Sequence, residues 1–566
     1  MGAAASAVSF TLNGEPARVD DGFSLLDALR EELGCRSVKD GCSPQGQCGC
    51  CTVWVDGLPR VACVTPVRRV AGRAVTTLEG VAAPLRDRWA DAFVATGASQ
   101  CGFCTPGIVM RLAALEDSSA GRVPTGDDIE AALRAHLCRC TGWQSIVEAA
   151  CMALGVPRGS APGDAGRSGV RDPLLAAWRA EVEGRTLQTS GRDVVLGGGG
   201  FADDGSPADA LLQLGAGSPL AEGFRPARAG AGRVQGRNST VPLSHPVEVP
   251  AGDWAVTLQT TWVEPAYVEP DASWSRPDDR PASPLANGGA FGGKHHSPVP
   301  DHARALADES GRAVRVLWRR EDVVRRGPKR PPLALGLRRD GSGVVRVART
   351  AGSADLSPMV ARVHELAPDV VVEVVDVSGP PVARTLRGAV WAELLAARSV
   401  VASLDLGAHG TPAGTGRARV LVPGAGSAEV EVRLDEGPRG RLHVDMWAGV
   451  VLDPVTLRSY ALGAVHQGLG MVWSEGVAVD GAGEPLDLTI RSFGILAARD
   501  MPDVTVDLHE EDEDGWPVNG SDAVFAATLA AAWLAEGRPP RWPTRRAAVR
   551  APRRDVAPSG RREELP

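Results

Sequence analysis

The sequence lacks long apolar runs, contains almost no lysine, and has no cysteine after Cys151. Its longest apolar run, residues 523–535, is shorter than the roughly 20 residues that cross a bilayer, so we expect no membrane span. A net charge of -8 argues against the basic surface that nucleic acid requires. Residues 1–10 lack the basic and apolar regions of an export signal, and we therefore predict a cytoplasmic protein. The scarcity of lysine reflects coding bias and excludes nothing.

The eleven cysteines are all confined to residues 35–151 of the 566. A disulfide framework is typical of small secreted domains, whereas this chain is large and shows no export signal. Reduced thiols that bind metal are therefore the better interpretation. The distribution predicts a redox or zinc module in the first part of the chain, joined to a much larger part without cysteine.

Composition and periodicity divide the chain into five segments of an α+β protein. A small sheet with one helix comes first, followed by a helical domain, a linker rich in Gly, Ala and Pro, a larger α+β body, and a basic disordered tail. The predicted boundaries are 1–80, 81–155, 156–240, 241–537 and 538–566. The run Gly197–Gly200 lacks the remaining pattern of a dinucleotide-binding fold, so we interpret it as linker or surface.

Local signals support the first of these domains. Asn13-Gly14 and Asp56-Gly57 each follow a strand-like run and are typical of hairpin turns. Between them, Ser24 can cap a helix whose leucines share one face. These signals predict a sheet packed on one helix before the helical segment begins.

Cysteines in and after a glycine-rich loop form the first candidate metal site. A [2Fe–2S] centre needs four thiolates besides its inorganic sulfides. A zinc site would show two clean pairs, so the spacing C-x5-C-x2-C with one later cysteine favours iron–sulfur over zinc. Cys50 and Cys51 are alternative ligands, and we choose Cys51 for its spacing from Cys48. The predicted ligands are Cys42, Cys48, Cys51 and Cys63.

A second cysteine group follows in two motifs, Q-C-G-F-C-T-P-G at residues 100–107 and C-R-C-T-G at residues 138–142. Each pair is predicted to sit at a helix terminus, where N–H groups favour an anionic cluster. Taken alone, these pairs could also bind zinc. Together with the first loop, residues 7–155 resemble the iron–sulfur part of the molybdenum hydroxylases, the family of xanthine dehydrogenase and aldehyde oxidase.

The resemblance implies a β-grasp, ferredoxin-like domain and a helical domain, each with one [2Fe–2S] cluster. It also implies that Gln100 contacts the pterin of a molybdenum cofactor. The first loop has one residue more between its first two cysteines than is usual in the family. The cysteines left over, Cys35, Cys50 and Cys151, are expected to be buried small side chains. The ligands that the resemblance implies for the second cluster are Cys101, Cys104, Cys138 and Cys140.

The larger body carries further matches to the family's molybdopterin-binding domain. Residues 287–294 are similar to its G-G-x-F-G-G loop, residues 387–389 to its R-G-x-G turn, and residues 466–470 to its Q-G-x-G stretch. Because the body is shorter than in the family, we expect a truncated, divergent version of that domain. The cofactor contacts implied by the resemblance are Gly289, Phe291, Gly292, Arg387 and Gln467.

Two departures from the family bear on catalysis. Val263 stands where the family has a glutamine beside the molybdenum, and Asp522 stands where it has the catalytic glutamate. Asp522 is therefore the candidate catalytic base. It could equally cap the helix that starts at Ala523, and we favour the cap.

The sequence thus predicts an iron–sulfur oxidoreductase of the molybdenum hydroxylase type. Electrons would pass from a molybdopterin site, where an aldehyde or N-heterocycle is hydroxylated, through two [2Fe–2S] clusters to a flavin-binding subunit or another acceptor. Two alternatives stay open. One is a non-catalytic electron-transfer or assembly subunit with a degenerate cofactor domain, and the other is a zinc-stabilised interaction protein.

Overall fold

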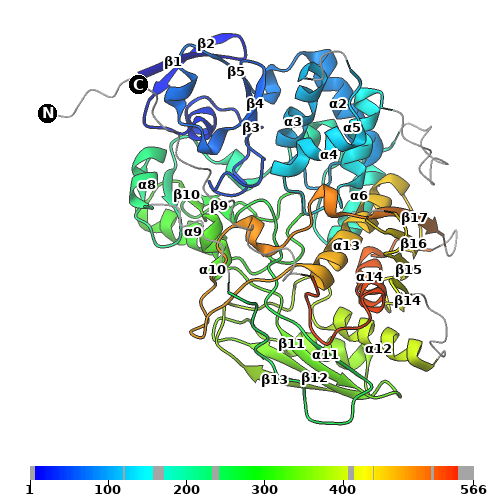
Figure 1. Ribbon diagram of the computed structural model, residues 1–566. Helices are drawn as coiled ribbons and strands as arrows, with labels where there is room; N and C mark the ends of the chain where they lie inside the picture. Colours follow the sequence, from blue (N-terminus) through cyan, green and yellow to red (C-terminus); the bar gives the residue numbers. More distant parts are fainter. Residues whose placement is uncertain are drawn as a thin grey trace, which may run out of the picture.

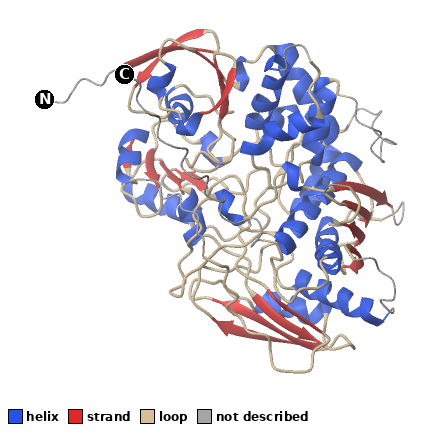
Figure 2. Cartoon of the chain, viewed as in Figure 1, coloured by secondary structure: helices blue, strands red, loops and turns tan. Residues whose placement is uncertain are grey.

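The computed structural model describes residues 7–118, 122–156, 171–232, 241–405, 413–437, 439–510 and 515–545. Its first two domains lie side by side, and the other described residues form a body beneath them (Figure 1). The named strands belong to four separate sheets, with helices packed against them (Figure 2). This arrangement is the mixed α+β fold that the sequence predicts.

The first domain is a five-stranded sheet packed on one short helix, as expected. Its elements are β1 (Ala7–Leu12), β2 (Glu15–Asp20), α1 (Leu25–Asp27), β3 (Thr52–Val55), β4 (Leu58–Val61) and β5 (Ala74–Thr76). β1 pairs antiparallel with β2 and parallel with β5. Asn13 and Asp56 adopt positive φ at the two predicted hairpin turns. The Ser24 hydroxyl accepts a hydrogen bond from the Asp27 amide at 3.1 Å, which confirms the helix cap.

Within its described residues, the second domain is a bundle of helices, as predicted. The helices are α2 (Ala83–Thr96), α3 (Thr105–Ser118), α4 (Gly126–Ala132) and α5 (Gln144–Leu154). Apolar side chains at helical spacing pack between them, among them Ile108, Leu112, Ile129, Leu133 and Ile146. α3 begins directly after Cys104, and α5 begins shortly after Cys140. Both cysteine pairs of this domain therefore lie at helix N-termini.

The segment expected to be a linker is folded where the structure describes it, so that prediction is wrong for residues 171–232. It supplies α6 (Pro173–Gly184), α7 (Arg192–Val195), β6 (Leu211–Leu214), β7 (Ala221–Glu222) and α8 (Phe224–Gly230). Its small residues allow close packing rather than a free chain. The Gly197 carbonyl, for example, accepts a hydrogen bond from the buried Lys39 ammonium group at 3.0 Å.

The body contains three four-stranded sheets among its described residues. The order β7-β6-β10-β9 includes β9 (Ala272–Ser275) and β10 (Val314–Leu317). The order β13-β12-β11-β8 comprises β8 (Val256–Gln259), β11 (Leu333–Leu337), β12 (Gly343–Arg349) and β13 (Val370–Asp376). The order β14-β15-β16-β17 comprises β14 (Thr415–Leu421), β15 (Ser427–Arg433), β16 (Arg441–Trp447) and β17 (Asp503–His509).

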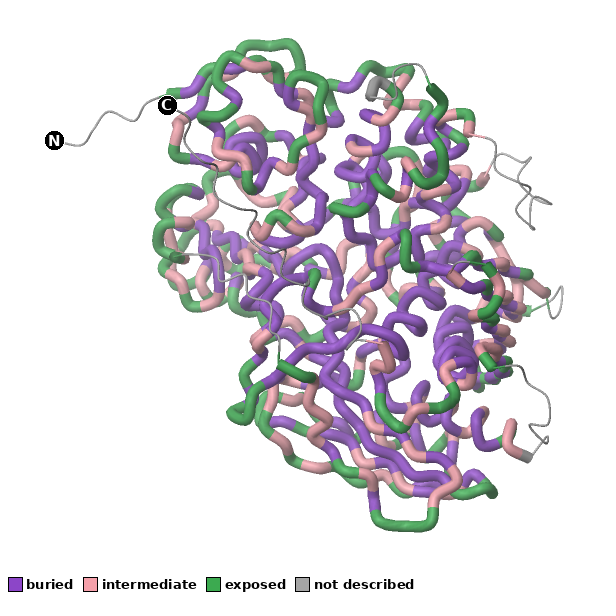
Figure 3. The backbone as a smooth tube through the Cα atoms, viewed as in Figure 1, coloured by how far each residue is buried: buried purple, intermediate pink, exposed green. Residues whose placement is uncertain are grey.

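Two apolar helices form the centre of the body. α13 (Pro454–Trp473) and α14 (Ser521–Ala535) pack against each other and are buried along almost their whole length (Figure 3). The other body helices are α9 (Val299–Ser310), α10 (Arg320–Arg326), α11 (Ser357–Leu366) and α12 (Trp391–Asp405). The apolar run 523–535 is therefore the core of α14. In the described part of the chain, no helix is long and apolar enough to cross a membrane.

The start of the expected disordered tail is also packed, which corrects that prediction for residues 538–545. Trp542 is 1% exposed and lies edge-on to Trp533, with ring centroids 5.4 Å apart. Its amide donates a hydrogen bond to the Gln259 carbonyl at 3.0 Å. The rest of the predicted tail, 546–566, lies outside the described residues.

Candidate functional site

The first cysteine group is formed by the loop before β3 and the turn after β4. Its predicted ligands, Cys42, Cys48, Cys51 and Cys63, are all buried. The Cys42 sulfur accepts hydrogen bonds from the amides of Gln45 at 3.1 Å and Gln47 at 3.4 Å. Hydrogen bonds from the thiols of Cys48 and Cys63 hold the pKa of Cys42 well below its usual value. Converging thiols with such donors fit a cluster that carries negative charge.

The second cysteine group joins the two helix N-termini of the second domain. The sulfurs of Cys101 and Cys140 are 3.5 Å apart. A hydrogen bond from Cys104 lowers the pKa of Cys138 to about 6, and the Thr141 hydroxyl, 3.2 Å from the Cys138 sulfur, also lowers it. The first turns of α3 and α5 add amide dipoles that favour negative charge at this position. The group thus fits a second iron–sulfur cluster.

Cys50 and Cys51 have different neighbours. The Cys63 amide donates to the Cys51 sulfur at 3.4 Å, so Cys51 lies beside the ligand expected from the end of β4. The Cys50 thiol instead interacts with Cys48, while burial and the nearby sulfurs of Cys42, Cys51 and Cys138 raise its pKa. This geometry favours Cys51 as the ligand. All eleven cysteines are free and buried, including Cys35 and Cys151.

A backbone hydrogen bond connects the two cysteine groups directly. The amide of Leu137, the residue before Cys138, donates to the Cys48 carbonyl at 3.0 Å. Beside it, the His136 ring lies 3.1 Å from the Thr52 hydroxyl. A Cβ on Gly49 would come within 2.5 Å of the His136 ring, so glycine is required here. The two predicted clusters are consequently held as close, rigid neighbours.

A cavity in the body lies against the second cysteine group and gathers several of the predicted pterin contacts. Its volume is about 370 Å³, including the open space at its mouth. Phe291, Arg387 and Gln467 line the cavity, together with Arg139, which stands between Cys138 and Cys140. Val263 also lines it, so methyl groups occupy the position where the resemblance predicts an amide.

The other predicted cofactor contacts are used by the protein itself. The Gln100 amide donates to the carbonyls of Cys140 at 2.9 Å and Ser459 at 3.0 Å. A Cβ on Gly289 would lie 2.9 Å from the Cys101 sulfur, and one on Gly292 would lie 1.8 Å from the Thr385 carbonyl oxygen. Both glycines have positive φ. They bring the Phe291 loop close to the second cysteine group and to the segment that carries Arg387.

Asp522 does not cap α14, so the prediction of a cap is wrong. Its two carboxylate oxygens accept hydrogen bonds from Arg387 at 2.9 Å and Arg185 at 2.5 Å. The Asn519 side chain accepts the hydrogen bond from the Asp522 amide, at 3.1 Å. Guanidinium donors therefore hydrogen-bond to both oxygens of the candidate base, so a proton taken from a substrate would have to compete with these ion pairs.

The sequence did not predict the ion pairs around the cavity. Arg139 makes a bidentate ion pair with Glu475, at 2.5 and 2.7 Å. Arg330 makes another with Glu393, at 2.5 and 2.8 Å. The only sequence signal for Arg139 is its position between two ligands in C-R-C, which fixes its backbone. Each guanidinium group on the cavity wall is thus neutralised by a carboxylate.

The residues of the cavity wall fit a pterin, but carboxylates of the protein already neutralise the arginines there. An amide, a guanidinium group and a phenyl ring, from Gln467, Arg387 and Phe291, can bind a flat, anionic, hydrogen-bonding heterocycle. An anionic group of that molecule must compete with Asp522 for Arg387. The residues that would bind the group are therefore present, while the residues expected to assist hydroxylation are replaced or occupied.

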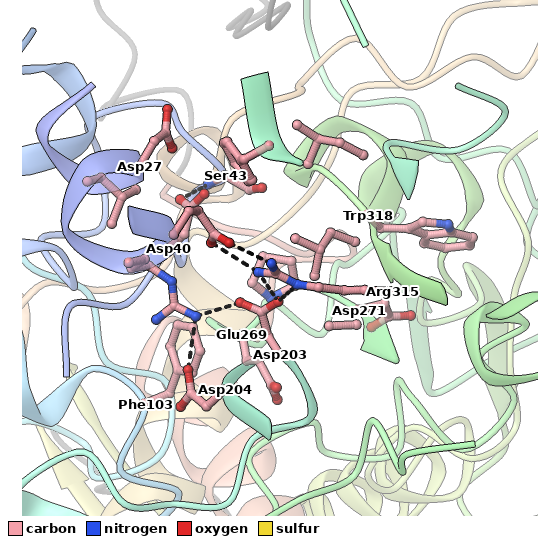
Figure 4. Close-up of a pocket in the computed structure, with 18 residues that line it drawn as sticks. Asp27, Asp40, Ser43, Phe103, Asp203, Asp204, Glu269, Asp271, Arg315 and Trp318 are labelled. Carbon is pink, nitrogen blue, oxygen red and sulfur yellow. Dashed lines mark hydrogen bonds and ion pairs between the residues drawn. The ribbon is translucent and has the colours of Figure 1, made fainter. Parts of the chain in front are cut away.

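A larger cavity lies where the first domain meets the body (Figure 4). It measures about 550 Å³ with its open mouth, and two buried arginines extend along it. Arg30 pairs with Asp203 at 2.6 Å and Asp204 at 2.9 Å. Arg315 of β10 pairs with Asp203 and with Glu31, both at 2.6 Å. Because breaking a buried ion pair is costly, this network fixes the first domain against the body.

Three family models match segments of the chain, and known proteins match its first part. Residues 5–79 match a 2Fe-2S iron-sulfur cluster binding domain, residues 77–151 a [2Fe-2S] binding domain, and residues 342–502 a molybdopterin cofactor-binding domain. The aldehyde oxidoreductase of Megalodesulfovibrio gigas is 41% identical over 152 residues, which cover 25% of this chain and 16% of that protein. The nicotinate dehydrogenase small FeS subunit of Eubacterium barkeri is 39% identical over 142 residues, which cover 25% of this chain and 88% of that subunit.

The fold of the whole chain is similar to a solved structure. The aldehyde oxidoreductase from Desulfovibrio desulfuricans superimposes with a TM-score of 0.67 at 16% identity, covering 96% of this chain and 99% of that chain. Because the chain covers 88% of the Eubacterium barkeri subunit at 39% identity and matches the three family models, it belongs to the molybdenum hydroxylase family, that of xanthine dehydrogenase and aldehyde oxidase. It contains two [2Fe–2S]-binding domains and a molybdopterin-binding domain.

The choice between Cys50 and Cys51 can be tested by paired substitutions. We expect dithionite-reduced protein to show two distinct S = 1/2 signals in electron paramagnetic resonance, because the two cysteine groups have different hydrogen-bond donors. Cys51→Ala should remove one signal and about half of the iron, whereas Cys50→Ala should retain both signals. Loss of a signal in Cys50→Ala alone would assign the ligand to Cys50, and zinc in place of iron would contradict both cluster assignments.

Proposed function

We propose that this chain transfers electrons between its pterin-binding cavity and a redox partner at the first domain. The observation that supports this most strongly is the position of Arg139, which separates two predicted cluster ligands and also lines the cavity. The Arg139 carbonyl accepts a hydrogen bond from the cavity residue Gln467 at 3.4 Å. The cavity and the second cysteine group therefore share one residue and one hydrogen-bond network.

Hydrogen bonds within the chain fix the loops that carry the cysteine groups along this path. When bound, [2Fe–2S] clusters supply one-electron transfer, and a molybdenum pterin supplies two-electron oxidation of a substrate. Gln100 and Gln467 bind the carbonyls of the C-R-C loop, and Leu137 binds the first loop through Cys48. These contacts would hold two bound clusters and a pterin in fixed positions relative to one another, which favours electron transfer.

Pterin binding is tested by the molybdenum and pterin content of the purified protein. We expect Arg387→Ala to lower that content at least tenfold, because the side chain lost is the guanidinium group at the cavity wall. Iron should stay near four atoms per chain, as expected for two [2Fe–2S] clusters. Arg384→Ala, an exposed arginine in the same segment, is the matched control and should change neither metal. Wild-type protein that contains iron but never a pterin would contradict the proposed role of the cavity.

Hydroxylation of an aldehyde or an N-heterocycle in the same cavity is the second candidate function. The shared fold with an aldehyde oxidoreductase favours it. A hydroxylase needs a base within hydrogen-bond reach of the reacting atoms. Asp522 is the carboxylate at the family position, but Arg387 and Arg185 occupy it, and Val263 cannot donate a hydrogen bond. The geometry therefore supports electron transfer better than hydroxylation by this chain alone.

Turnover with an artificial dye as electron acceptor separates the two functions. With a panel of aldehydes and purines, we expect rates at background for protein whose iron and molybdenum content has been measured. Robust turnover that Asp522→Asn abolishes, with metal content retained, would show instead that Asp522 acts as the base.

The proposed partner is a flavin-binding subunit that docks beside the first cysteine group. Val64, next to Cys63, is 58% exposed and contacts the tip of the cluster loop, where a Cβ on Gly46 would meet it at 2.8 Å. Exposed arginines precede and follow it in the sequence: Arg60, Arg68 and Arg69. An exposed apolar residue in a basic segment suits a partner with an acidic docking face.

If the partner docks at Val64, a single negative charge at that position should weaken its binding. In protein isolated from its native host, we expect Val64→Glu to reduce the co-purifying flavin at least tenfold while both cluster signals are retained. Val371→Glu is the control, since that valine is 55% exposed on β13, in a different sheet of the body. Flavin that co-purifies equally with both variants would place the docking face elsewhere.

A further inference from the structure

The outer face of the third body sheet carries a cluster of two histidines and two aspartates. β16 and β17 run parallel, with His443 beside Thr505, Asp445 beside Asp507, and Trp447 beside His509. Side chains two residues apart on a strand share a face. The alternating burial of both strands places these residues on the side away from the core.

The distances within this cluster suit a small metal ion. The Nε2 atom of His443 lies 3.2 Å from a carboxylate oxygen of Asp445 and 3.6 Å from one of Asp507. Ligand atoms of all three residues lie within 4.8 Å of one another. Ligands about 2.0 Å from a tetrahedral zinc ion are roughly 3.3 Å apart, which is close to these separations.

The orientation of the His443 ring also points to a cation. Its Nδ1 atom lies 2.8 Å from the Thr505 hydroxyl, which donates its own hydrogen to the Leu442 carbonyl at 3.3 Å. When the hydroxyl donates in this way, its oxygen accepts from Nδ1–H, and in that tautomer of the neutral ring Nε2 carries a lone pair. That lone pair faces two carboxylates, an arrangement that needs either a proton or a metal ion between them.

Among the described residues, the ion pairs of Asp445 and Asp507 are with histidines and not with arginines. Asp445 and Asp507 are direct neighbours across the strands, and like charges in that position destabilise a sheet. The nearby carboxylates of Glu429 and Glu431 are already paired with Arg417 and Arg433. A divalent cation would neutralise the aspartate pair.

His509 contacts the carboxylate oxygen of Asp445 that His443 does not contact. Its Nε2 atom lies 2.7 Å from the second carboxylate oxygen of Asp445. Its ring stacks on Trp447 with centroids 4.6 Å apart and an interplanar angle of 18°. Partners of this kind commonly orient the ligands of metal sites.

We propose that His443, Asp445 and Asp507 bind a divalent transition-metal ion, and that His509 positions Asp445. Imidazole and carboxylate together match Zn²⁺, with the fourth coordination position open to solvent. Because β17 is the edge strand of its sheet, the ion would connect that edge to β16. The site is separate from both cysteine groups and does not depend on the proposed electron transfer.

Calorimetric titration of the full-length, cluster-loaded protein with ZnCl₂ tests the site. We expect the wild-type chain to bind one Zn²⁺ that His443→Gln and Asp507→Asn bind at least tenfold more weakly. His509→Gln should weaken binding roughly tenfold, as is typical for residues that orient a ligand. His364→Gln, an exposed histidine on α11, is the matched control and should bind as the wild type does. Equal affinity in the wild type and His443→Gln would overturn the proposal.

Hydrogen exchange gives a second measurement that does not depend on affinity. Zn²⁺ should slow exchange of the β17 amides in the wild type and leave them unchanged in His443→Gln. Both substituted side chains are substantially exposed, 41% for His443 and 52% for Asp507, so the variants should fold. Unchanged exchange in β17 of the zinc-treated wild type would show that no ion joins these strands.

Discussion

The architecture depends on a backbone contact between α13 and the loop that carries Cys138 and Cys140. A Cβ on Gly463 would lie 1.8 Å from the Cys140 carbonyl oxygen, and one on Gly142 would lie 2.3 Å from the Leu462 carbonyl oxygen. Only glycine at both positions lets the helix approach this far. α13 then presents Ser459 to Gln100 and Gln467 to Arg139, which join the body to the second cysteine group.

Charge balance follows from the same contact. With α13 in place, Glu475 just beyond its end reaches Arg139, and the start of α14 brings Asp522 to Arg387. Burying a guanidinium group without a partner costs free energy. These two ion pairs avoid that cost without any bound ligand. The same pairs engage the carboxylates of Glu475 and Asp522 with arginines of the cavity wall.

The parts that the sequence predicted correctly are those with a local cause. The hairpin turns at Asn13 and Asp56, the cap at Ser24 and the helices after Cys104 and Cys140 each follow from residues a few positions apart. The packed segment 171–232 was missed because small residues look the same in a linker and in a tight interface. The Arg139–Glu475 pair joins residues 336 positions apart, and nothing in a single sequence relates them. The cap at Asp522 failed for the same reason, since both of its arginines come from other segments.

The burial of the cysteine loops implies an order of assembly. Arg320 of the body donates to the Gly41 carbonyl at 2.6 Å, and the Gln45 side chain reaches the Leu488 carbonyl at 2.7 Å. The loop at Gly289 covers Cys101 in the same way. In the closed chain these contacts cover part of both cysteine loops, so iron and sulfide would have the freest access before the amino-terminal domains pack against the body. Maturation of the metal centres would then be a checkpoint that precedes the final closure of the chain.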